Sequence, residues 1–380
     1  MYHPMKPSSL FNLRNALPFW VSLCLIPAVL VAAAYGGWAL LLPPLIAWVA
    51  TSVLDYFLGL NPNNVDPETP DDQLFWHRMI TLLWFPIQFF LIFGLIWYVS
   101  ATDHLNAYEK VGLFFGVGVV TGGIGIVYAH ELMHQTNHLE RWLGDLLLAS
   151  VLYSHFRSEH LLVHHRYVGT PKDPVTARYN EGFHRFFPRV LVQCVRSAWL
   201  AETGKLKAKG MPVLDASNPF WRYFALQAGF LLLAIIIGGW AGLGLFMYQA
   251  FIAVWNLELV NYAEHYGLTR KHLGNGKYEP AQLHHSWNAA HTATNWLLIN
   301  LQRHSDHHYK PGRRFPLLQN SADYAAPQLP YGYPVMLMIA MMPNLFRRMM
   351  NPRVQKWRAM YYPEISDWSA YKSASNPLPK

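Results

Sequence analysis

Long apolar runs separated by short polar segments dominate the first 130 residues and recur between residues 220 and 260. A helix needs about 20 residues to cross the hydrocarbon core of a bilayer, and six runs approach that length. Short glycine turns join the first run to the second and the fifth to the sixth, which predicts two helical hairpins. The pattern predicts an all-α integral membrane protein with six transmembrane helices, at residues 18–35, 38–58, 80–99, 111–128, 223–238 and 242–260.

Positive charge is distributed unevenly between the segments that flank these runs. Of the 30 Lys and Arg residues, twelve lie in residues 129–222 and fourteen lie after residue 260. An excess of Lys and Arg marks the cytoplasmic side of a membrane protein, and an even number of crossings puts both termini on one side. We therefore expect a single domain over residues 1–380, with cytoplasmic segments 129–222 and 261–357, cytoplasmic termini and a tail at 358–380.

Composition agrees with a membrane protein and excludes several other classes. Apolar residues make up 52% of the chain and charged residues only 14%, whereas about a quarter of a soluble protein is charged. Two cysteines are too few for a disulfide framework or an iron–sulfur cluster. The net charge of +8 suits anionic lipid or an acidic soluble partner at the cytoplasmic face. No nucleic-acid partner is expected.

Nineteen histidines are present, and many of them fall into four clusters at the ends of predicted spans or inside the cytoplasmic segments. His130–His134 reads His-Glu-Leu-Met-His and directly follows the fourth span. Glu159–His165 is the second cluster, and Asn261–Gly267 follows the sixth span. Leu301–His308 is the fourth.

The spacing within the clusters suits metal ligation. Residues three or four apart share one face of a helix, with Cβ atoms about 5–6 Å apart, so His130 and His134 can converge on one ion. The same spacing relates His160 to His164, and His304 to His307 or His308.

Adjacent histidines in two clusters point about 100° apart around a helix, so each doubled pair can serve a second nearby ion. Counting one histidine from the third cluster gives nine, which exceeds the coordination number of one ion. We therefore predict a dimetal site in a histidine-rich helical cap at the cytoplasmic face. The candidate ligands are His130, His134, His160, His164, His165, His265, His304, His307 and His308.

Carboxylates near the clusters are candidates for orienting the histidines, because a ligating imidazole usually donates its other N–H to such a group. For each, an ion pair with a nearby Arg is the alternative. The candidates are Glu131, Glu159, Asp173, Glu264 and Asp306. The remaining nearby histidines are expected to pack or to hydrogen-bond: His138, His155, His184, His272, His284, His285 and His291.

The four clusters, in this order and between hydrophobic hairpins, resemble those of the membrane-bound histidine-rich diiron desaturases and hydroxylases. The third and fourth clusters are similar to the signature segments of the AlkB-type alkane 1-monooxygenases (alkane hydroxylases), and the similarity continues to about Trp357. Met133 and Val163 stand where glycine is common in that family. Gln135 stands where a basic residue is usual, and in this respect the sequence is more similar to the xylene monooxygenases.

The resemblance implies a bacterial inner-membrane monooxygenase with two non-haem iron ions. Imidazole suits several metals, so the residues alone leave the metal open, and zinc can substitute. The implied reaction hydroxylates the terminal methyl group of a medium- to long-chain alkane, taken from the bilayer, with O2. Electrons would come from rubredoxin, reduced by rubredoxin reductase and NADH. The chain has no cysteine set for an iron–sulfur site and no GxGxxG loop, so an external donor is expected.

Two further sets of residues are candidates for binding the substrate and the electron donor. Trp48, Gly122 and Ile126 are candidates for lining a substrate channel, although helix packing would explain each of them. Cationic residues of the fourth cluster and the segment behind it are candidates for docking an acidic electron donor. These are Arg303, Arg313 and Arg314.

Other functions remain open at this point. His130-Glu131-x-x-His134 also reads as the zinc-protease motif, with Glu131 as the general base of an intramembrane protease. That reading leaves most of the clustered histidines unexplained. A metal transporter would place its ligands in the middle of the spans, whereas these lie past the span ends. Within the resembled family, xylene-type hydroxylation and fatty-acyl hydroxylation or desaturation are the alternatives.

Overall fold

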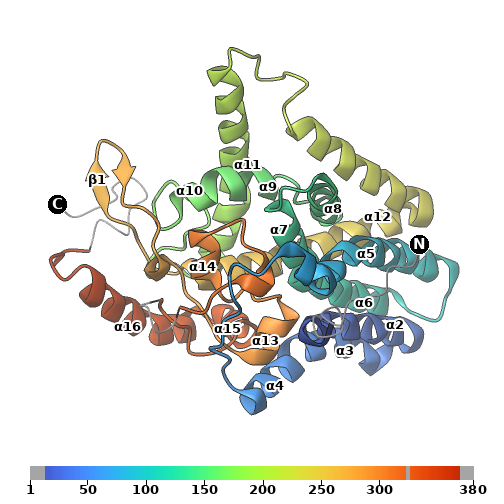
Figure 1. Cartoon of the computed structure of the whole chain (residues 1–380). Coiled ribbons are helices and arrows are strands. Elements are labelled where there is room, and N and C mark those ends of the chain that lie inside the picture. The colour runs from blue at the N-terminus through green and yellow to red at the C-terminus, as the bar shows by residue number, and fades with distance from the viewer. Residues whose placement is uncertain (1–12, 322–325, 369–380) are drawn as a thin grey trace.

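The computed structural model describes residues 13–321 and 326–368, and nearly all of its regular structure is helical (Figure 1). Most of the predicted tail, from residue 369 onward, lies outside the described residues. Among the described residues, five helices are long and apolar enough to cross a membrane, so the chain is a membrane protein. They are Leu13–Tyr35, Gly37–Leu58, Asp71–Ala101, Ala107–Met133 and Phe220–His265.

The first four of these helices coincide with the first four predicted spans, although short 3-10 and π turns interrupt them. Pro43 and Pro44 lack an N–H donor, and the backbone on both sides of them departs from α geometry. The elements of this part are η1 (Leu17–Cys24), α2 (Leu25–Tyr35), η2 (Gly37–Leu41), α3 (Leu42–Pro44), η3 (Leu45–Ala50), α4 (Thr51–Leu58), η4 (Asp71–Leu74), α5 (Phe75–Ala101), α6 (Ala107–Val120), η5 (Thr121–Ile126) and α7 (Val127–Met133).

The predicted fifth and sixth spans both lie in α12 (Phe220–His265), which is bent at Gly239. Gly239 has φ +61°, a backbone conformation that favours glycine. A Cβ atom added to Gly242 would lie 2.8 Å from the carbonyl oxygen of Ala234, so the two limbs of α12 approach closely beyond the bend. The count of six separate crossings therefore stays a prediction.

The remaining elements carry the polar part of the chain. A two-stranded antiparallel hairpin is the one sheet among the described residues. The elements are α8 (His138–Ala149), α9 (Phe156–Glu159), η6 (His160–His164), α10 (His165–Tyr167), α11 (Phe183–Ala208), β1 (His272–Gly274), β2 (Lys277–Tyr278), η7 (Leu283–His285), α13 (Thr292–Leu297), α14 (His304–Tyr309), η8 (Phe315–Leu317), α15 (Tyr333–Ala340) and α16 (Pro343–Tyr361).

Glycines bring the fourth span and α12 into backbone contact. A Cβ atom on Gly118 would lie 2.5 Å from Cβ of Ile252, and one on Gly122 would lie 2.7 Å from Cα of Ala253. Small residues permit such an approach between membrane helices. Nearby, the hydroxyl of Thr121 donates to the side chain of Gln249 at 2.9 Å. This contact holds the ends of α7 and α12, both of which carry histidines, beside each other.

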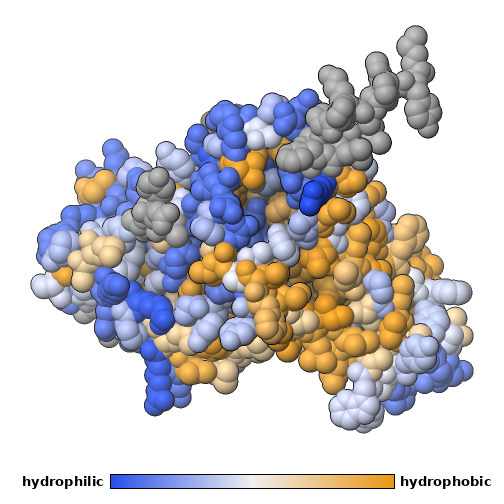
Figure 2. Space-filling view, turned by 60° about the horizontal axis from the view of Figure 1, so that its bottom comes forward, coloured by the Kyte–Doolittle hydropathy of each residue, from blue (hydrophilic) through white to orange (hydrophobic). Residues whose placement is uncertain are grey.

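Hydrophobic surface gathers over one side of the molecule, where the N-terminal helices lie, and hydrophilic surface covers the other side (Figure 2). Large apolar side chains on the span helices, such as Leu30, Trp38, Phe90 and Trp97, are exposed. Such a continuous apolar surface is unfavourable in water and suits contact with lipid.

We expect Gly118→Ala to lower the stability of the protein. The new methyl group would overlap Ile252, and overpacking of this kind costs about 1–3 kcal/mol. Thermal unfolding of the purified protein in a neutral detergent measures the effect. Gly94→Ala in α5 is the matched control, because its Cβ atom meets nothing within 4 Å. Equal melting temperatures for the two variants would contradict the close contact.

Candidate metal centre

Four segments from different parts of the chain deliver the candidate histidines to one place. His130 lies in the last turn of α7, and His134 directly follows that helix. The second cluster spans η6 and the start of α10. His265 is the last residue of α12, and α14 contains the three histidines of the fourth cluster.

All nine predicted ligands fall into two groups, within each of which the candidate ligand atoms lie within 4.8 Å of one another. The first group has five members and the second has four. The groups are His130, His134, His160, His165 and His307, and His164, His265, His304 and His308.

The second cluster is divided differently from the prediction. We expected His160 to share an ion with His164, as α-helical spacing of four residues would place them. Instead His160–His164 form a π turn, and Nε2 of His160 lies 2.9 Å from Nε2 of His165, while His164 joins the other group. The wider π turn brings residues five apart onto one face, and such turns occur frequently at functional sites.

The fourth cluster is divided too. His304 and His308, four residues apart on α14, belong to the second group, with their Nε2 atoms 3.0 Å apart. His307 points to the first group, where its Nε2 atom lies 3.1 Å from Nε2 of His165. A single short helix therefore contributes to both groups.

The distances between ring nitrogens fit ligands of a common ion. Nε2 of His160 lies 2.9 Å from Nε2 of both His130 and His165, and Nε2 of His304 lies 3.1 Å from that of His265. Ligands about 2.1 Å from a metal and at right angles to each other are about 3 Å apart. A neutral imidazole has one N–H and one lone pair, so one nitrogen cannot satisfy two converging neighbours by donation.

Six ring nitrogens in these groups have no hydrogen-bond partner among the described residues, and two of the six are Nε2 atoms. Nε2 of His134 and Nε2 of His164 are buried and unpaired among the described residues. Unpaired buried polar atoms are costly, so both nitrogens are available to an ion.

Burial favours the neutral form of six rings in the two groups, which is the form that ligates a metal. It lowers the pKa of His134 to about 3. Burial also holds the pKa well below its ordinary value in five further group members, and neighbouring imidazoles lower it further. These are His160, His165, His304, His307 and His308.

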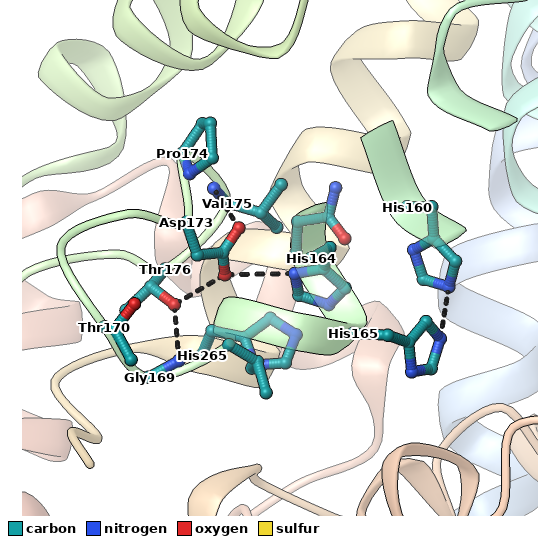
Figure 3. A network of polar contacts seen from close by, with 12 residues as sticks. His160, His164, His165, Gly169, Thr170, Asp173, Pro174, Val175, Thr176 and His265 are labelled. Carbon is teal, nitrogen blue, oxygen red and sulfur yellow. Dashed lines mark hydrogen bonds and ion pairs between the residues drawn. The ribbon is translucent and has the colours of Figure 1, made fainter. Parts of the chain in front are cut away.

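Asp173 contacts a candidate ligand directly (Figure 3). Its Oδ2 atom lies 3.0 Å from Nδ1 of His164 and accepts a hydrogen bond of 2.7 Å from the hydroxyl of Thr176. The backbone N–H of Val175 donates to Oδ1, and that of Gly169 donates to the Thr176 hydroxyl oxygen. The carboxylate is thereby held in place to orient His164, with Nε2 of that ring directed to the second group.

The other predicted carboxylates differ in their contacts. Oε1 of Glu264 lies 3.4 Å from Nδ1 of His304. Glu131 instead accepts a hydrogen bond from Gln135, and Asp306 pairs with Arg313, so neither matches the prediction of a direct histidine partner. For Asp306, the structure shows the alternative named above, an ion pair with a nearby Arg.

Both carboxylate oxygens of Glu159 are buried without a hydrogen-bond partner among the described residues. Burial and the neighbouring carboxylates Asp173 and Glu258 hold the pKa of Glu159 well above its ordinary value. Glu258 was missed by the sequence analysis. It lies inside a candidate span, is buried, and accepts hydrogen bonds from Tyr153 and Asn261. The sequence signal that could have identified Glu258 is an ionisable residue within an apolar run.

An apolar cavity adjoins the metal centre. Val127, Val260 and Leu301, which line it, lie three to five residues before candidate ligands on their respective segments, and Asn256 and Tyr333 are among its few polar lining residues. The other lining residues come chiefly from η3, η5 and α15.

The substrate-channel role stays a prediction, and the structure places two of its three residues at the apolar cavity. Trp48 and Gly122 line the cavity, whereas Ile126 is buried elsewhere. The reason is the π turn at Thr121–Ile126, which shifts the following residues around the helix, so that Val127 faces the cavity instead.

The docking prediction is wrong for Arg303. This side chain is buried, and its guanidinium donates to the carbonyl oxygens of Asn63 and Leu318, so it cannot meet a partner protein. Arg313 and Arg314 do line an open groove, of about 600 Å³, that reaches His134. Both are ion-paired, with Asp306 and with Asp71 and Glu140 respectively.

The histidines predicted to have other roles lie outside both groups. His284 stacks on Tyr361 with ring centroids 4.1 Å apart, and His285 hydrogen-bonds to Tyr362. His155 packs against Tyr153. His138, His184, His272 and His291 are likewise absent from the two groups.

Comparison with known proteins places the histidine clusters inside a recognised family region. The family model for fatty acid desaturases matches residues 107–340, which include all nine histidines. Alkane 1-monooxygenase 1 of Pseudomonas aeruginosa is 38% identical over 318 residues, covering 81% of each chain. Alkane 1-monooxygenase 2 of Alcanivorax borkumensis is 32% identical over 371 residues, covering 94% of this chain and 95% of the relative.

A relative with an aromatic substrate in its name is more distant. The xylene/toluene monooxygenase hydroxylase component of Pseudomonas putida is 27% identical over 347 residues, covering 89% of each chain.

We expect His155 to destabilise the protein as the pH falls. Burial lowers its pKa to about 4, while an unfolded histidine titrates near 6.5. Between these values the unfolded chain binds more protons than the folded one, so stability declines as the pH drops through this window. Removing the ring by His155→Gln should therefore reduce the loss of unfolding free energy between pH 7 and pH 5 by about 2 kcal/mol.

Denaturant unfolding at the two pH values measures this difference. The matched control is His138→Gln, which removes an exposed ring and should leave the pH dependence as in the wild type. A pH dependence in His155→Gln that equals that of the control would exclude a buried neutral imidazole at this position.

Proposed function

The chain belongs to the fatty acid desaturase family and, within it, to the alkane 1-monooxygenases, and from this premise we propose that it hydroxylates the terminal methyl group of medium- to long-chain alkanes with O2. The observation that carries the proposal is the convergence of nine histidines, most of them buried, in groups of five and four, beside an apolar cavity. An oxidoreductase of this kind needs both a redox metal centre and a dry substrate site.

The proposed reaction is R–CH3 + O2 + 2e− + 2H+ → R–CH2OH + H2O. One oxygen atom enters the C–H bond of the methyl group, and the other leaves as water with the two electrons and two protons. We propose two iron ions as the resident metals, held by the five and the four histidines respectively. When bound, these irons supply the activation of O2. The neutral rings, with nitrogens about 3 Å apart, are the observation that fits them.

The residues around the centre have positioning roles in this proposal. Asp173 orients His164, and Glu264 lies within reach of Nδ1 of His304. Burial of the rings excludes water from the reacting groups, which limits side reactions. The substrate has no acidic proton, so no side chain needs to act as a general base on it.

The cavity supplies the binding site for the hydrocarbon. Its aliphatic and aromatic lining matches an alkane, and it extends from the segments that carry His130, His265 and His304 to Trp48 on the second span. An alkane gains free energy by leaving water, whereas its transfer between two apolar surroundings changes its free energy little, so transfer from lipid into the cavity costs little. We propose that the methyl end of the alkane lies toward the histidines and that Trp48 limits the length of the chain.

Electrons have to come from outside, and we propose rubredoxin as the donor, fed by rubredoxin reductase and NADH. The open groove beside the centre is the supporting observation, because His134 is half-buried and lines it. Lys310, Arg313 and Arg314 line the same groove and would face an acidic protein, although Asp71 reduces their charge.

We also propose that the centre lies on the cytoplasmic side of the bacterial inner membrane, with six crossings and both termini in the cytoplasm. The supporting observations are the excess of Lys and Arg in the histidine-bearing segments and the bend at Gly239 within α12. Alkanes are favoured over xylenes because the alkane 1-monooxygenases are 32–38% identical to this chain and the xylene-type relative is 27% identical.

Removal of the indole at Trp48 should allow longer alkanes to bind. We expect Trp48→Ala to shift the preferred substrate toward longer chains, because the indole lines the end of the cavity on the second span. Alkanes of about 8 to 16 carbons are supplied together at equal concentrations, and the ratio of their products measures the preference.

Trp97→Ala is the matched control, since this exposed tryptophan on α5 does not line the cavity. An unchanged preference in Trp48→Ala would exclude Trp48 as the residue that limits chain length.

The function is tested with purified protein loaded with iron and supplied with rubredoxin, its reductase, NADH, octane and 18O2. We expect 18O-labelled 1-octanol and two metal ions per chain. His307→Ala removes a ligand of the first group and should lower the rate by at least about 100-fold, more than the loss of an outer partner of a ligand costs.

His138→Ala removes an exposed histidine outside both groups and should retain activity and both metals. Two metals with no oxygenated octane, but with hydroxylated xylene, would move the substrate to the aromatic alternative. One metal per chain, unchanged in His307→Ala, would overturn the dimetal centre.

A further inference from the structure

A second pocket, lined by charged and polar side chains, lies where α9, η6, α11 and the start of α12 meet. It encloses about 330 Å³. The loop that joins α11 to α12 forms one side of it, through Ser217 and Pro219. Its function is not explained by the hydroxylation reaction, because it contains none of the candidate ligands.

Positive charge dominates the walls of this pocket. Four cationic side chains line it, and Glu202 is the one lining carboxylate. A second carboxylate, Asp145, lies behind the wall and pairs with two of the cations, so the net charge remains +2. The cations are Arg157, Lys205, Lys209 and Arg222.

Both guanidinium groups are held in place. Nη1 of Arg157 donates to both oxygens of Asp145, each at 2.6 Å, and Nε of Arg222 lies 3.2 Å from the same carboxylate. The Arg222 guanidinium also lies over the rings of Trp142 and Tyr223, at 5.5 and 5.6 Å from their centroids. Two arginines anchored on one buried carboxylate form a rigid cationic wall whose remaining N–H groups suit an oxyanion.

The floor of the pocket is a hydrogen-bonded chain of polar groups. The Ser158 hydroxyl donates to Oε1 of Glu202 at 2.6 Å and lies 2.9 Å from the hydroxyl of Tyr223. Lys205 donates to Oε2 of Glu202 at 3.0 Å. Glu202 is thus neutralised within the floor, which leaves Lys209 and the arginines to attract an anion.

Apolar surface continues directly from the basic walls. Leu161, Leu162 and Leu206 line the pocket itself. Exposed apolar side chains on the adjoining helices include Trp142, Leu200, Trp221 and Phe224. Tryptophans and basic residues at the end of a spanning helix are typical of the membrane–water interface.

The orientation of α11 agrees with an interfacial position. In Figure 1, α11 runs across the direction of the neighbouring span helices rather than along it. Val192 and Val195, about one turn apart, are exposed on this helix at 69% and 44%. A helix that exposes apolar side chains in this way can lie in the plane of the interface.

We propose that this pocket binds the phosphate group of an anionic phospholipid, with the acyl chains against the apolar surface that adjoins it. A phosphodiester is recognised by arginine N–H groups and lysines, and basic pockets between membrane helices bind anionic head groups. A free phosphate shares the chemistry of the head group but has no apolar part that could contact Leu161 and Leu162. An acidic protein segment would not account for the exposed tryptophans beside the pocket, which are typical of the membrane–water interface.

The bound lipid would join α9, α11 and the start of α12 at this pocket. Arg157 and Ser158 belong to α9, which leads without a break into η6, where His160 begins the π turn. The lipid therefore stabilises the segment that carries three candidate ligands by linking it to α11 and α12.

Lipid binding to the full-length protein is tested in a neutral detergent by native mass spectrometry. The probes are phosphatidylglycerol, phosphatidylcholine of the same acyl chains, and inorganic phosphate as a competitor. The double variant K205Q/K209Q removes two lining cations and should weaken phosphatidylglycerol binding about fivefold for each lysine. K205R/K209R keeps both charges and should retain binding.

The matched control is K207Q/K277Q, which removes two lysines outside the pocket, one of them on the same helix. It should bind phosphatidylglycerol as the wild type does. Equal binding by K205Q/K209Q and this control, or equal binding of phosphatidylcholine and phosphatidylglycerol, would overturn the proposal. Displacement of the lipid by millimolar phosphate would identify a free-phosphate site instead. A loss of rubredoxin affinity without a loss of lipid affinity would identify a protein-docking surface.

Discussion

The constraint on which this structure depends is the convergence of nine imidazole rings, seven of which have an Nε2 atom about 3 Å from that of another ring. Each neutral ring can donate through only one nitrogen, and burial holds the pKa of His160 and His307 too low for protonation to relieve the crowding. Rings such as His160, with two Nε2 neighbours at 2.9 Å, are therefore satisfied only by a shared cation. The fold has to hold this unfavourable arrangement in place before any metal contributes.

The surrounding elements hold it by rigid, short-range contacts. Gly118 and Gly122 let the fourth span touch the backbone of α12, which fixes the ends of the two helices that carry His130 and His265. The π turn at His160–His164 then distributes one run of histidines between the two groups. Asp173, itself fixed by the Val175 N–H and the Thr176 hydroxyl, determines which nitrogen of His164 faces the centre.

Chemically distinct surfaces meet around the centre. The apolar cavity reaches it from the side of the span helices, and the groove lined by His134 reaches it from the polar side. The basic pocket beside α9 lies behind the segment of the second cluster. The proposed hydrocarbon, electron donor and anionic lipid would therefore use different surfaces around one centre.

The sequence by itself determined the class of the protein, its apolar segments and the identity of all nine histidines, because hydrophobicity and residue type are local properties. It also indicated Trp48 and Gly122 as cavity residues. Only the tertiary structure decided how the histidines divide, since the partition depends on a π turn and on α14 pointing to both groups. For the same reason Val127 rather than Ile126 lines the cavity, and Arg303 is buried among loop carbonyls rather than exposed. Each of these outcomes depends on a change of helical register or on a contact between residues far apart in the chain, and neither can be read from spacing.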